Sequence, residues 1–453
     1  MVPLILLTWP SLFLVLVHGL HIPLAEQVVL SSPEPARTGI LRRFLIDKSL
    51  PGEVKGVIED LMHAGADLWH ASKHQVDVYI PPSVADTPFL SHQGDVEYTD
   101  SNVSFFPIST PSPSTWNLSS LSNSTFHESY HTLEDIENFT AQLAELHPDL
   151  VKLVNIGHSA EGREMVALEI AKSKGQNKKG HGISESEFAA KKHGFVITGA
   201  QHSREWIAVS TAMYLAHALV ADASEPHSLA SLLNHFDFHM VLVPNPDGYK
   251  NRQVVGPNEK CIGLDMNRNW GHKWKPTADF PFALDNTKNK KKKGPNVPTD
   301  PCSHWYPGHR AFESPEVNNI ANYITTLPRL RTFIDLRAYG QMLSAPFSYT
   351  CKRDPKDAED QIEAAMGAAR AIKEVHGTVF TTGTLCEMLY RAPGNVVDYM
   401  YAKAGIKYSY AAHLRDTGTY GFDLPPHWIR PVGEETVNMI KSLAHFIVDK
   451  KSG

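Results

Sequence analysis

The chain has 453 residues, enough for one large domain together with a smaller one. Hydrophobic residues make up 42% of the chain and charged residues 20%, proportions that exclude a wholly disordered protein. The formal net charge is −6 at pH 7, so no general positive field draws the chain onto nucleic acid or anionic lipid, and neither is expected as a partner.

The start of the chain predicts a signal peptide. Residues 1–20 are almost uniformly apolar, and Val17 and Gly19 suit the small-residue positions before a signal-peptidase cut. Pro3 and Pro10 interrupt the run and a basic N-terminal region is missing, so a membrane anchor is the alternative, because about 20 apolar residues can span a bilayer. We expect a secreted chain, extracellular or vacuolar, that is free of the membrane once the signal is removed. In an oxidising compartment its four cysteines can form two disulfides.

A small module follows over residues 25–98. Its pattern predicts a helix over residues 51–65 and an alternating strand over residues 76–80, preceded by Trp69. The module contains no clustered His or Cys and no paired carboxylates. Its own residues therefore predict a small α/β unit without assigned chemistry.

Residues 99–128 predict a linker, because they are rich in Ser, Pro, Thr and Asn and show no helical or strand periodicity. Acceptor triplets for N-glycosylation are concentrated here, and in an exposed linker of a secreted protein we expect them to be modified. The acceptors are Asn102, Asn117 and Asn123, with Asn138 just beyond the linker.

The domain over residues 129–453 alternates helical and strand patterns, which is typical of an α/β sheet protein. The periodicity predicts helices over residues 130–146 and 208–220. Buried strands are expected over residues 195–198, 239–244, 333–336 and 407–411. Ligands of open α/β sheets bind at the carboxyl ends of the strands, where the polar motifs of this domain fall.

Two of these polar motifs carry candidate chemistry. His202 and Glu205 lie at the junction of a strand and a helix and can converge on one metal ion, since His, Glu and a third ligand form the usual zinc-peptidase set. Asn267 and Arg268 can grip a carboxylate through adjacent amide and guanidinium groups. Taken singly, a chance His-x-x-Glu and a structural arginine are the favoured interpretations.

Taken together and in this order, the motifs resemble the metallocarboxypeptidases of the pancreatic carboxypeptidase A/B type, peptidase family M14. The resemblance runs over residues 130–447 and rests on YHTLEDIENF, GAQHSREWIA, VLVPNPDGY, CIGLDMNRNW, FIDLRAYGQ and AGIKYSYAAHLRDTGTYGF. It implies a central mixed β-sheet with helices on both faces. The small module resembles the inhibitory activation segment, or prodomain, of that family.

The resemblance also implies roles for single residues. His202 and Glu205 match the first two zinc ligands of the family. The implied partner is the C-terminus of a peptide or protein, and the implied state is a monomer. Substrate contacts are implied for Arg204 in the cleft, Asn267 and Arg268 at the terminal carboxylate, the mobile Tyr390, and Val397, which would favour apolar or aromatic side chains. Cys261 and Cys302 match a family disulfide, and we expect Cys351 and Cys386 to form a second one.

Three departures from the family pattern bear on activity. Arg337 stands where the family has its third zinc ligand, a histidine, and His413 stands where it has the catalytic glutamate. Arg337 would repel the metal ion and could itself pair with Glu205. In addition, Tyr249 runs directly into Lys250, where the family has about ten more residues, including an arginine that polarises the scissile carbonyl; a gene-model error would give the same junction.

These departures predict a weakened zinc site and an inactive protein. Changing a residue behind a metal ligand already costs about 10–100-fold in affinity, and replacing an imidazole ligand by a permanent cation costs more. Losing a general base removes a factor of about 10²–10⁴. We therefore expect a catalytically inactive member, similar to the inactive fungal metallocarboxypeptidase-like proteins linked to cell-wall organisation. The alternative is an active zinc carboxypeptidase in which His413 joins His202 and Glu205 as the third ligand.

Two further features concern processing. The resemblance implies activation by cleavage at basic residues before the catalytic domain, but His74 to Leu150 contain no Lys or Arg, so we expect the prodomain to stay attached. An insertion over residues 276–299 carries a lysine-rich run at residues 288–293. It predicts an exposed, solvated loop, with a polyanion-binding or processing site as the alternative.

Overall fold

The computed structural model describes residues 38–46, 52–72, 74–85, 96–104, 116–172, 192–251, 263–276, 301 and 305–450. The expected signal peptide, the lysine-rich run, Cys261 and Cys302 lie outside the described residues. The small module and the large domain belong to one compact unit, Ala36–Gly453.

The small module is a four-stranded antiparallel sheet in the order β2-β3-β1-β4. The helix expected over residues 51–65 is α1, and the strand expected over residues 76–80 is β3, so both predictions are confirmed. Alternating apolar residues hold the sheet against α1, among them Phe44, Ile58 and Val78, all fully buried. Its elements are β1 (Thr38–Leu45), α1 (Gly52–His63), β2 (Asp67–Ala71), β3 (Gln75–Ile80), α2 (Pro82–Ala85) and β4 (Thr99–Ser104).

Part of the region predicted as a linker forms regular secondary structure. Its first residues form β4, which pairs antiparallel with β1 and places Asn102 opposite Ile40. The sequence pattern predicted no strand here, because β4 is an edge strand that shows little apolar alternation. Val103 is its buried residue, and its pairing with β1 needs only backbone hydrogen bonds. Further along, Trp116 is buried in the core of the large domain. The side chains of the four expected glycosylation acceptors are exposed, as modification requires: Asn102, Asn117, Asn123 and Asn138.

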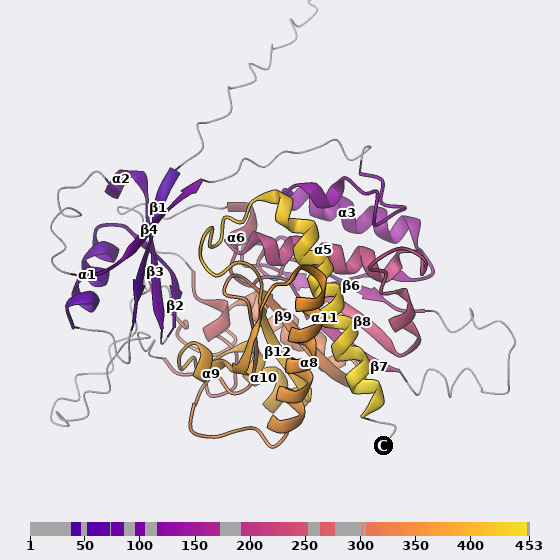
Figure 1. Cartoon of the computed structure of the whole chain (residues 1–453). Helices are drawn as coiled ribbons and strands as arrows, with labels where there is room; N and C mark the ends of the chain where they lie inside the picture. The colour runs from indigo at the N-terminus through magenta and orange to yellow at the C-terminus, as the bar shows by residue number, and fades with distance from the viewer. Residues whose placement is uncertain are drawn as a thin grey trace, which may run out of the picture. The chain divides into compact units, whose positions relative to one another are not determined.

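The large domain is built on an eight-stranded mixed sheet in the order β11-β10-β12-β9-β7-β8-β6-β5 (Figure 1). The neighbours β12, β9, β7 and β8 run parallel to one another, and β5, β6 and β10 bring antiparallel pairs. The four strands expected in this domain are β7, β8, β9 and β12, which confirms those predictions. The bounds are β5 (Val151–His158), β6 (Glu164–Ile170), β7 (His193–Thr198), β8 (Phe236–Val241), β9 (Leu330–Arg337), β10 (Met342–Ala345), β11 (Thr381–Thr384) and β12 (Tyr408–His413).

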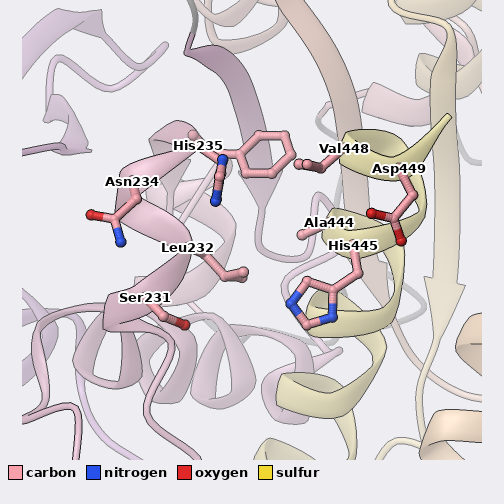
Figure 2. Close-up of a pocket in the computed structure, with 9 residues that line it drawn as sticks. Ser231, Leu232, Asn234, His235, Ala444, His445, Val448 and Asp449 are labelled. Carbon is pink, nitrogen blue, oxygen red and sulfur yellow. The ribbon is translucent and has the colours of Figure 1, made fainter. Parts of the chain in front are cut away.

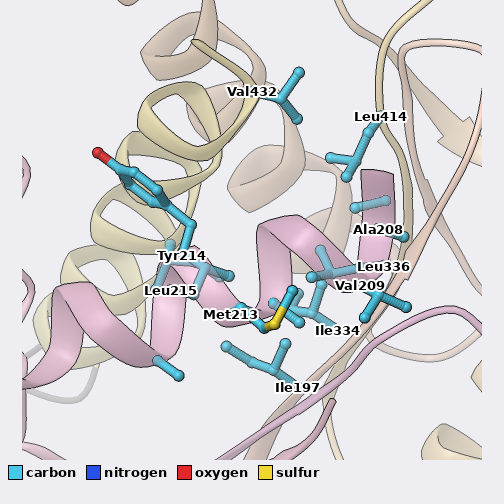
Figure 3. Close-up of a cluster of buried hydrophobic side chains, with 14 of the residues drawn as sticks. Ile197, Ala208, Val209, Met213, Tyr214, Leu215, Ile334, Leu336, Leu414 and Val432 are labelled. Atoms are coloured by element: carbon cyan, nitrogen blue, oxygen red, sulfur yellow. The ribbon is translucent and has the colours of Figure 1, made fainter. Parts of the chain in front are cut away.

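Helices cover both faces of this sheet, as expected. Ile197 of β7 packs in one buried cluster with Met213 of α5 (Figure 3). Its neighbour Val196 lies in a second cluster with Ile320 of α7. Successive side chains of a strand point to opposite faces, so the two clusters lie on opposite sides of the sheet. The helices are α3 (Leu133–Leu146), α5 (Trp206–Val220), α6 (Pro246–Asn251), α7 (Pro315–Thr326), α8 (Ala358–His376), α9 (Leu385–Met388), α10 (Val396–Ala402) and α11 (Ile429–Asp449). Within the ranges given above, no helix is both long and apolar enough to cross a membrane.

A disulfide joins Cys351 to Cys386, with their Cα atoms 5.3 Å apart. It links the segment after β10 to α9, the short helix that follows β11. The expected second pair is therefore confirmed.

Two buried histidines fasten the segment before α3 to α5. His127 Nε2 lies 3.0 Å from His217 Nδ1, and both side chains are almost fully buried. Burial, together with the positive charge of Arg430, holds the pKa of each histidine below its ordinary value, and that of His217 falls to about 4. Both rings are therefore neutral at pH 7 and share one hydrogen bond.

This arrangement predicts a loss of stability in acid. Because the folded-state pKa of His217 lies below its unfolded value of about 6.5, its contribution is unchanged above pH 6.5 and declines as the pH falls towards 4, by about 2–3 kcal/mol. His217→Gln cannot titrate, so its free energy of unfolding in urea should fall less than that of the wild type between pH 7 and pH 4.5. The exposed His445→Gln serves as the control and should follow the wild type. An equal decline in all three proteins would contradict the assignment.

Candidate functional site

The predicted metal-site residues meet at the carboxyl ends of three neighbouring parallel strands, β7, β9 and β12. His202 and Glu205 follow β7, and Glu205 immediately precedes α5. Arg337 is the last residue of β9, and the register places it beside His413, the last residue of β12. The sheet topology alone therefore brings four predicted residues to one edge.

Arg337 is the centre of this cluster. Its Nε and Nη2 donate to the two carboxylate oxygens of Glu205, each at 2.9 Å, in a bidentate fork. Nη2 also lies 2.7 Å from Nδ1 of His202, and Nη1 donates to Asp335 at 3.3 Å. The side chain of Arg337 is buried, so the pairing with Glu205 that the sequence suggested takes place away from solvent.

The other nitrogen of His202 is also engaged. Nε2 lies 2.9 Å from Asp265 Oδ1, and Nδ1 lies 2.9 Å from Glu205 Oε1 as well as beside the guanidinium of Arg337. Asp265 in turn accepts from the backbone N–H of Asn267 at 2.9 Å and so ties the metal-site residues to the predicted carboxylate site.

The charges of the cluster compensate one another. Burial alone would raise the pKa of Glu205, but Arg337 and His202 outweigh it and hold that pKa well below the ordinary value. Burial opposes the charge on Arg337 as well, yet Glu205 and Asp335 raise the pKa of the guanidinium further. Arg337 is therefore a permanent internal cation paired with an ionised Glu205.

The residues present do not fit a zinc ion. A metal ion shared by His202 and Glu205 needs a histidine nitrogen and carboxylate oxygens as free donors. Both nitrogens of His202 and both oxygens of Glu205 already contact protein partners. Three of these four atoms contact the guanidinium of Arg337, and the fourth, His202 Nε2, contacts Asp265. Across the described part of the chain, no group of three or more His, Cys, Asp or Glu side chains is arranged to hold a metal ion.

His413 does not complete a rearranged ligand set. His413, His202 and Glu205 all belong to the described residues, and the three side chains are not arranged to hold a metal ion. His413 Nδ1 is buried without a hydrogen-bond partner. Burial first, and then the charge of Arg337, lower the pKa of His413 to about 3. The ring is therefore neutral at pH 7 and a very weak base.

The predicted carboxylate site lies on the short helical turn η5 (Met266–Arg268). Arg268 Nη1 donates to the carbonyl of Asn267 at 2.9 Å, and Nη2 donates to the phenol oxygen of Tyr390 at 2.8 Å. The Asn267 side-chain oxygen accepts from the N–H of Val396 at 3.0 Å, which fixes η5 against α10. Val397, the next residue of α10, is fully buried in the same apolar cluster as Met266.

Arg204 is held by the small module. Nη1 donates to Asp67 of β2 at 2.8 Å, Nη2 donates to the carbonyl of Leu68 at 3.3 Å, and the guanidinium stacks over the ring of Phe422. The residue predicted to line the substrate cleft is thus bound by the prodomain-like strand.

A second contact joins the two parts close to the site. Asp77 of β3 is fully buried and receives a fork from Arg43 at 2.8 and 3.0 Å. The phenol of Tyr339 donates to the same carboxylate at 2.7 Å, and Arg43 also donates to the carbonyl of Thr417. Tyr339 lies two residues after Arg337, so this contact borders the charged cluster.

Several residues that shape the site were not predicted from the sequence. Asp265 and Asp335 lie inside the motifs CIGLDMNRNW and FIDLRAYGQ. Each stands shortly before a predicted site residue, Asn267 or Arg337, and this position was the available signal. Asp335 accepts from Thr198 at 2.8 Å and from Gln201 at 3.0 Å, which orients it towards Arg337. Nothing in the local pattern indicated Asp77, because its partner in the large domain lies far away in the sequence.

A separate pocket lies away from these residues, between the segment before β8 and the end of α11 (Figure 2). None of the predicted site residues lines it. Its polar lining includes Asn234, His235, His445 and Asp449.

Comparison with known proteins gives one matching family model, two related sequences and one solved structure. A family model described as zinc carboxypeptidase, Peptidase_M14, matches residues 136–439. A metallocarboxypeptidase A-like protein of Trichophyton verrucosum is 33% identical over 409 residues, covering 84% of this chain and 87% of its own. The inactive metallocarboxypeptidase ECM14 of Paracoccidioides brasiliensis is 29% identical over 458 residues, covering 90% of this chain and 72% of its own. The crystal structure of thrombin-activatable fibrinolysis inhibitor has the same fold, with a TM-score of 0.71 at 23% identity over 91% of this chain and 99% of that one.

Proposed function

The chain belongs to the M14 family of zinc carboxypeptidases, and on that premise we propose that it is a secreted, catalytically inactive member that binds the C-termini of peptides or proteins without cutting them. One observation carries the proposal. The guanidinium of Arg337 occupies both carboxylate oxygens of Glu205 and Nδ1 of His202, the donors that a zinc ion would need. Similarity to a protein named inactive metallocarboxypeptidase supports it.

The reaction lacks its base as well as its metal. In active members, zinc polarises the water that attacks the peptide bond, and a glutamate takes up its proton. His413 stands at the position of that glutamate, and a ring with a pKa of about 3 accepts a proton poorly at neutral pH. The short Tyr249–Lys250 junction removes a third contribution, the donor to the scissile carbonyl, worth about 10²–10³ in rate.

The groups that recognise a C-terminus are retained. Arg268 offers a buried guanidinium for the terminal carboxylate, and Tyr390 lies within hydrogen-bonding distance of it. The apolar surroundings of Val397 favour an apolar or aromatic terminal side chain. The ligand class that follows is a peptide with a free carboxylate on such a residue.

A titration tests the binding. The full chain is titrated with benzoyl-glycyl-phenylalanine and with its C-terminal amide, and only the acid should bind well. Arg268→Ala removes a charge-assisted hydrogen bond and should weaken binding by about 10–100-fold, whereas the exposed Arg353→Ala should leave it unchanged. Equal affinity for acid and amide would contradict the proposed site.

The same ligand tests the inactivity. Free phenylalanine should accumulate no faster with the wild type than with Arg268→Ala. Faster release would favour the alternative, an active carboxypeptidase that uses His413. That alternative predicts bound zinc in the purified wild type and its loss in His413→Ala.

Other parts of the proposal come from the sequence. Secretion, glycosylation, a monomeric state and a role in cell-wall organisation remain predictions. Retention of the prodomain is supported by the contacts of Arg204 with Asp67 and of Tyr339 with Asp77, which attach β2 and β3 to the large domain beside the site.

A further inference from the structure

Trp305 joins the small module to the carboxylate site. Its side chain is 9% exposed and belongs to the buried apolar cluster of the small module, whose other members all come from residues 44–84. Trp305 itself is part of the large domain, shortly before α7. Tyr390 also packs against this cluster.

The polar edge of Trp305 acts on Tyr390. The indole Nε1 donates to the phenol oxygen of Tyr390 at 3.0 Å, and Arg268 Nη2 donates to the same oxygen at 2.8 Å. A phenol oxygen has two acceptor positions, so these two donors fix Tyr390 beside the guanidinium of Arg268. An incoming carboxylate that accepts two hydrogen bonds from the Arg268 guanidinium competes with the Tyr390 phenol for Arg268 Nη2.

We propose that Trp305 is a positioning residue that holds Tyr390 over Arg268 and keeps the carboxylate site closed while the small module is docked. The assignment of this site to peptide C-termini rests on the proposed function. The packing of Trp305 in the small-module cluster links the docking of that module to the closure of the site. The apparent affinity for a C-terminus is then the intrinsic affinity multiplied by the fraction of molecules in which Tyr390 is released.

Substitution of Trp305 in the full chain tests this contact between Trp305 and Tyr390, called the latch below. Trp305→Phe keeps an aromatic ring for packing and removes the N–H that donates to the Tyr390 phenol oxygen. It should bind benzoyl-glycyl-phenylalanine about 3–10-fold more tightly than the wild type, the factor expected from one hydrogen bond. The matched control is Trp274→Phe, which removes an indole N–H that donates to the carbonyl of Pro307, and it should leave the affinity unchanged. In a Tyr390→Phe background, which has no phenol oxygen, Trp305→Phe should change nothing.

Two outcomes overturn the latch. One is equal or weaker binding by Trp305→Phe while the wild type binds the peptide. If no variant binds the peptide at all, the proposed function fails instead, and the latch is decided by urea unfolding of Trp305→Phe, Tyr390→Phe and the double variant. The double variant should lose less stability than the sum of the losses of the two single variants. The difference should correspond to about 3–10-fold in the unfolding equilibrium constant, and strict additivity would overturn the latch.

Discussion

The double variant Arg337→His with His413→Glu is expected to bind one zinc ion per chain and to release C-terminal phenylalanine, whereas the wild type should do neither. Arg337→His removes the cation that now holds Glu205 and His202 and supplies an imidazole at the end of β9, giving the His₂Glu set of a catalytic zinc site. His413→Glu supplies a carboxylate base at the end of β12, the neighbouring strand. Zinc affinity should rise by more than about 100-fold, measured by metal analysis after dialysis and by calorimetry.

The single variants separate the two effects. Arg337→His alone should bind zinc but remain about 10²–10⁴-fold slower than the double variant, because the general base is missing. His413→Glu alone should stay without metal, since Arg337 still holds Glu205. Arg337→Leu removes the charge without offering a donor and is the matched control for metal binding. Stoichiometric zinc in the dialysed wild type would overturn the assignment of Arg337 as the group that excludes the metal.

The folded core was predictable where local periodicity determines structure. The apolar run around Val196 predicted β7, and the apolar spacing before Leu146 predicted α3, because burial of these side chains fixes one type of element. The polar strand β4 could not be read in this way, since its formation depends on the exposed edge of β1. Helix α11 did carry a usable signal, with Val432, Val437, Ile440, Leu443 and Ile447 all buried on one face.

The candidate site was predictable to the extent that sequence order places residues at strand ends. The motifs around His202 and Arg337 located both at the carboxyl ends of neighbouring strands, and the pairing of Arg337 with Glu205 followed from their charges. The second partner of His202, Asp265, could not be derived, because the hydrogen bond spans segments that only the tertiary fold brings together. The same holds for Trp305, whose role depends on contact with the small module.

Asp77→Asn is expected to destabilise the protein by about 3–5 kcal/mol, because it breaks a buried ion pair while leaving the guanidinium of Arg43 in place. The wild-type carboxylate is fully buried and accepts both nitrogens of the Arg43 fork and the phenol of Tyr339. An amide offers one oxygen instead of two and turns its nitrogen towards a second donor. The loss should appear as a lower midpoint of urea unfolding.

The neighbouring pair provides a matched control. Arg42 makes the same fork with Asp100 of β4, at 2.9 and 2.8 Å, but the Asp100 side chain is 35% exposed. Asp100→Asn should therefore cost about 1 kcal/mol or less, since solvent at the exposed carboxylate screens the pair. The two arginines are adjacent on β1, so the geometry and the sequence context of the two ion pairs are similar. The burial of the carboxylate is the main difference between the pairs. If both variants unfold at the same urea concentration, Asp77 is not the residue that fastens the small module to the large domain.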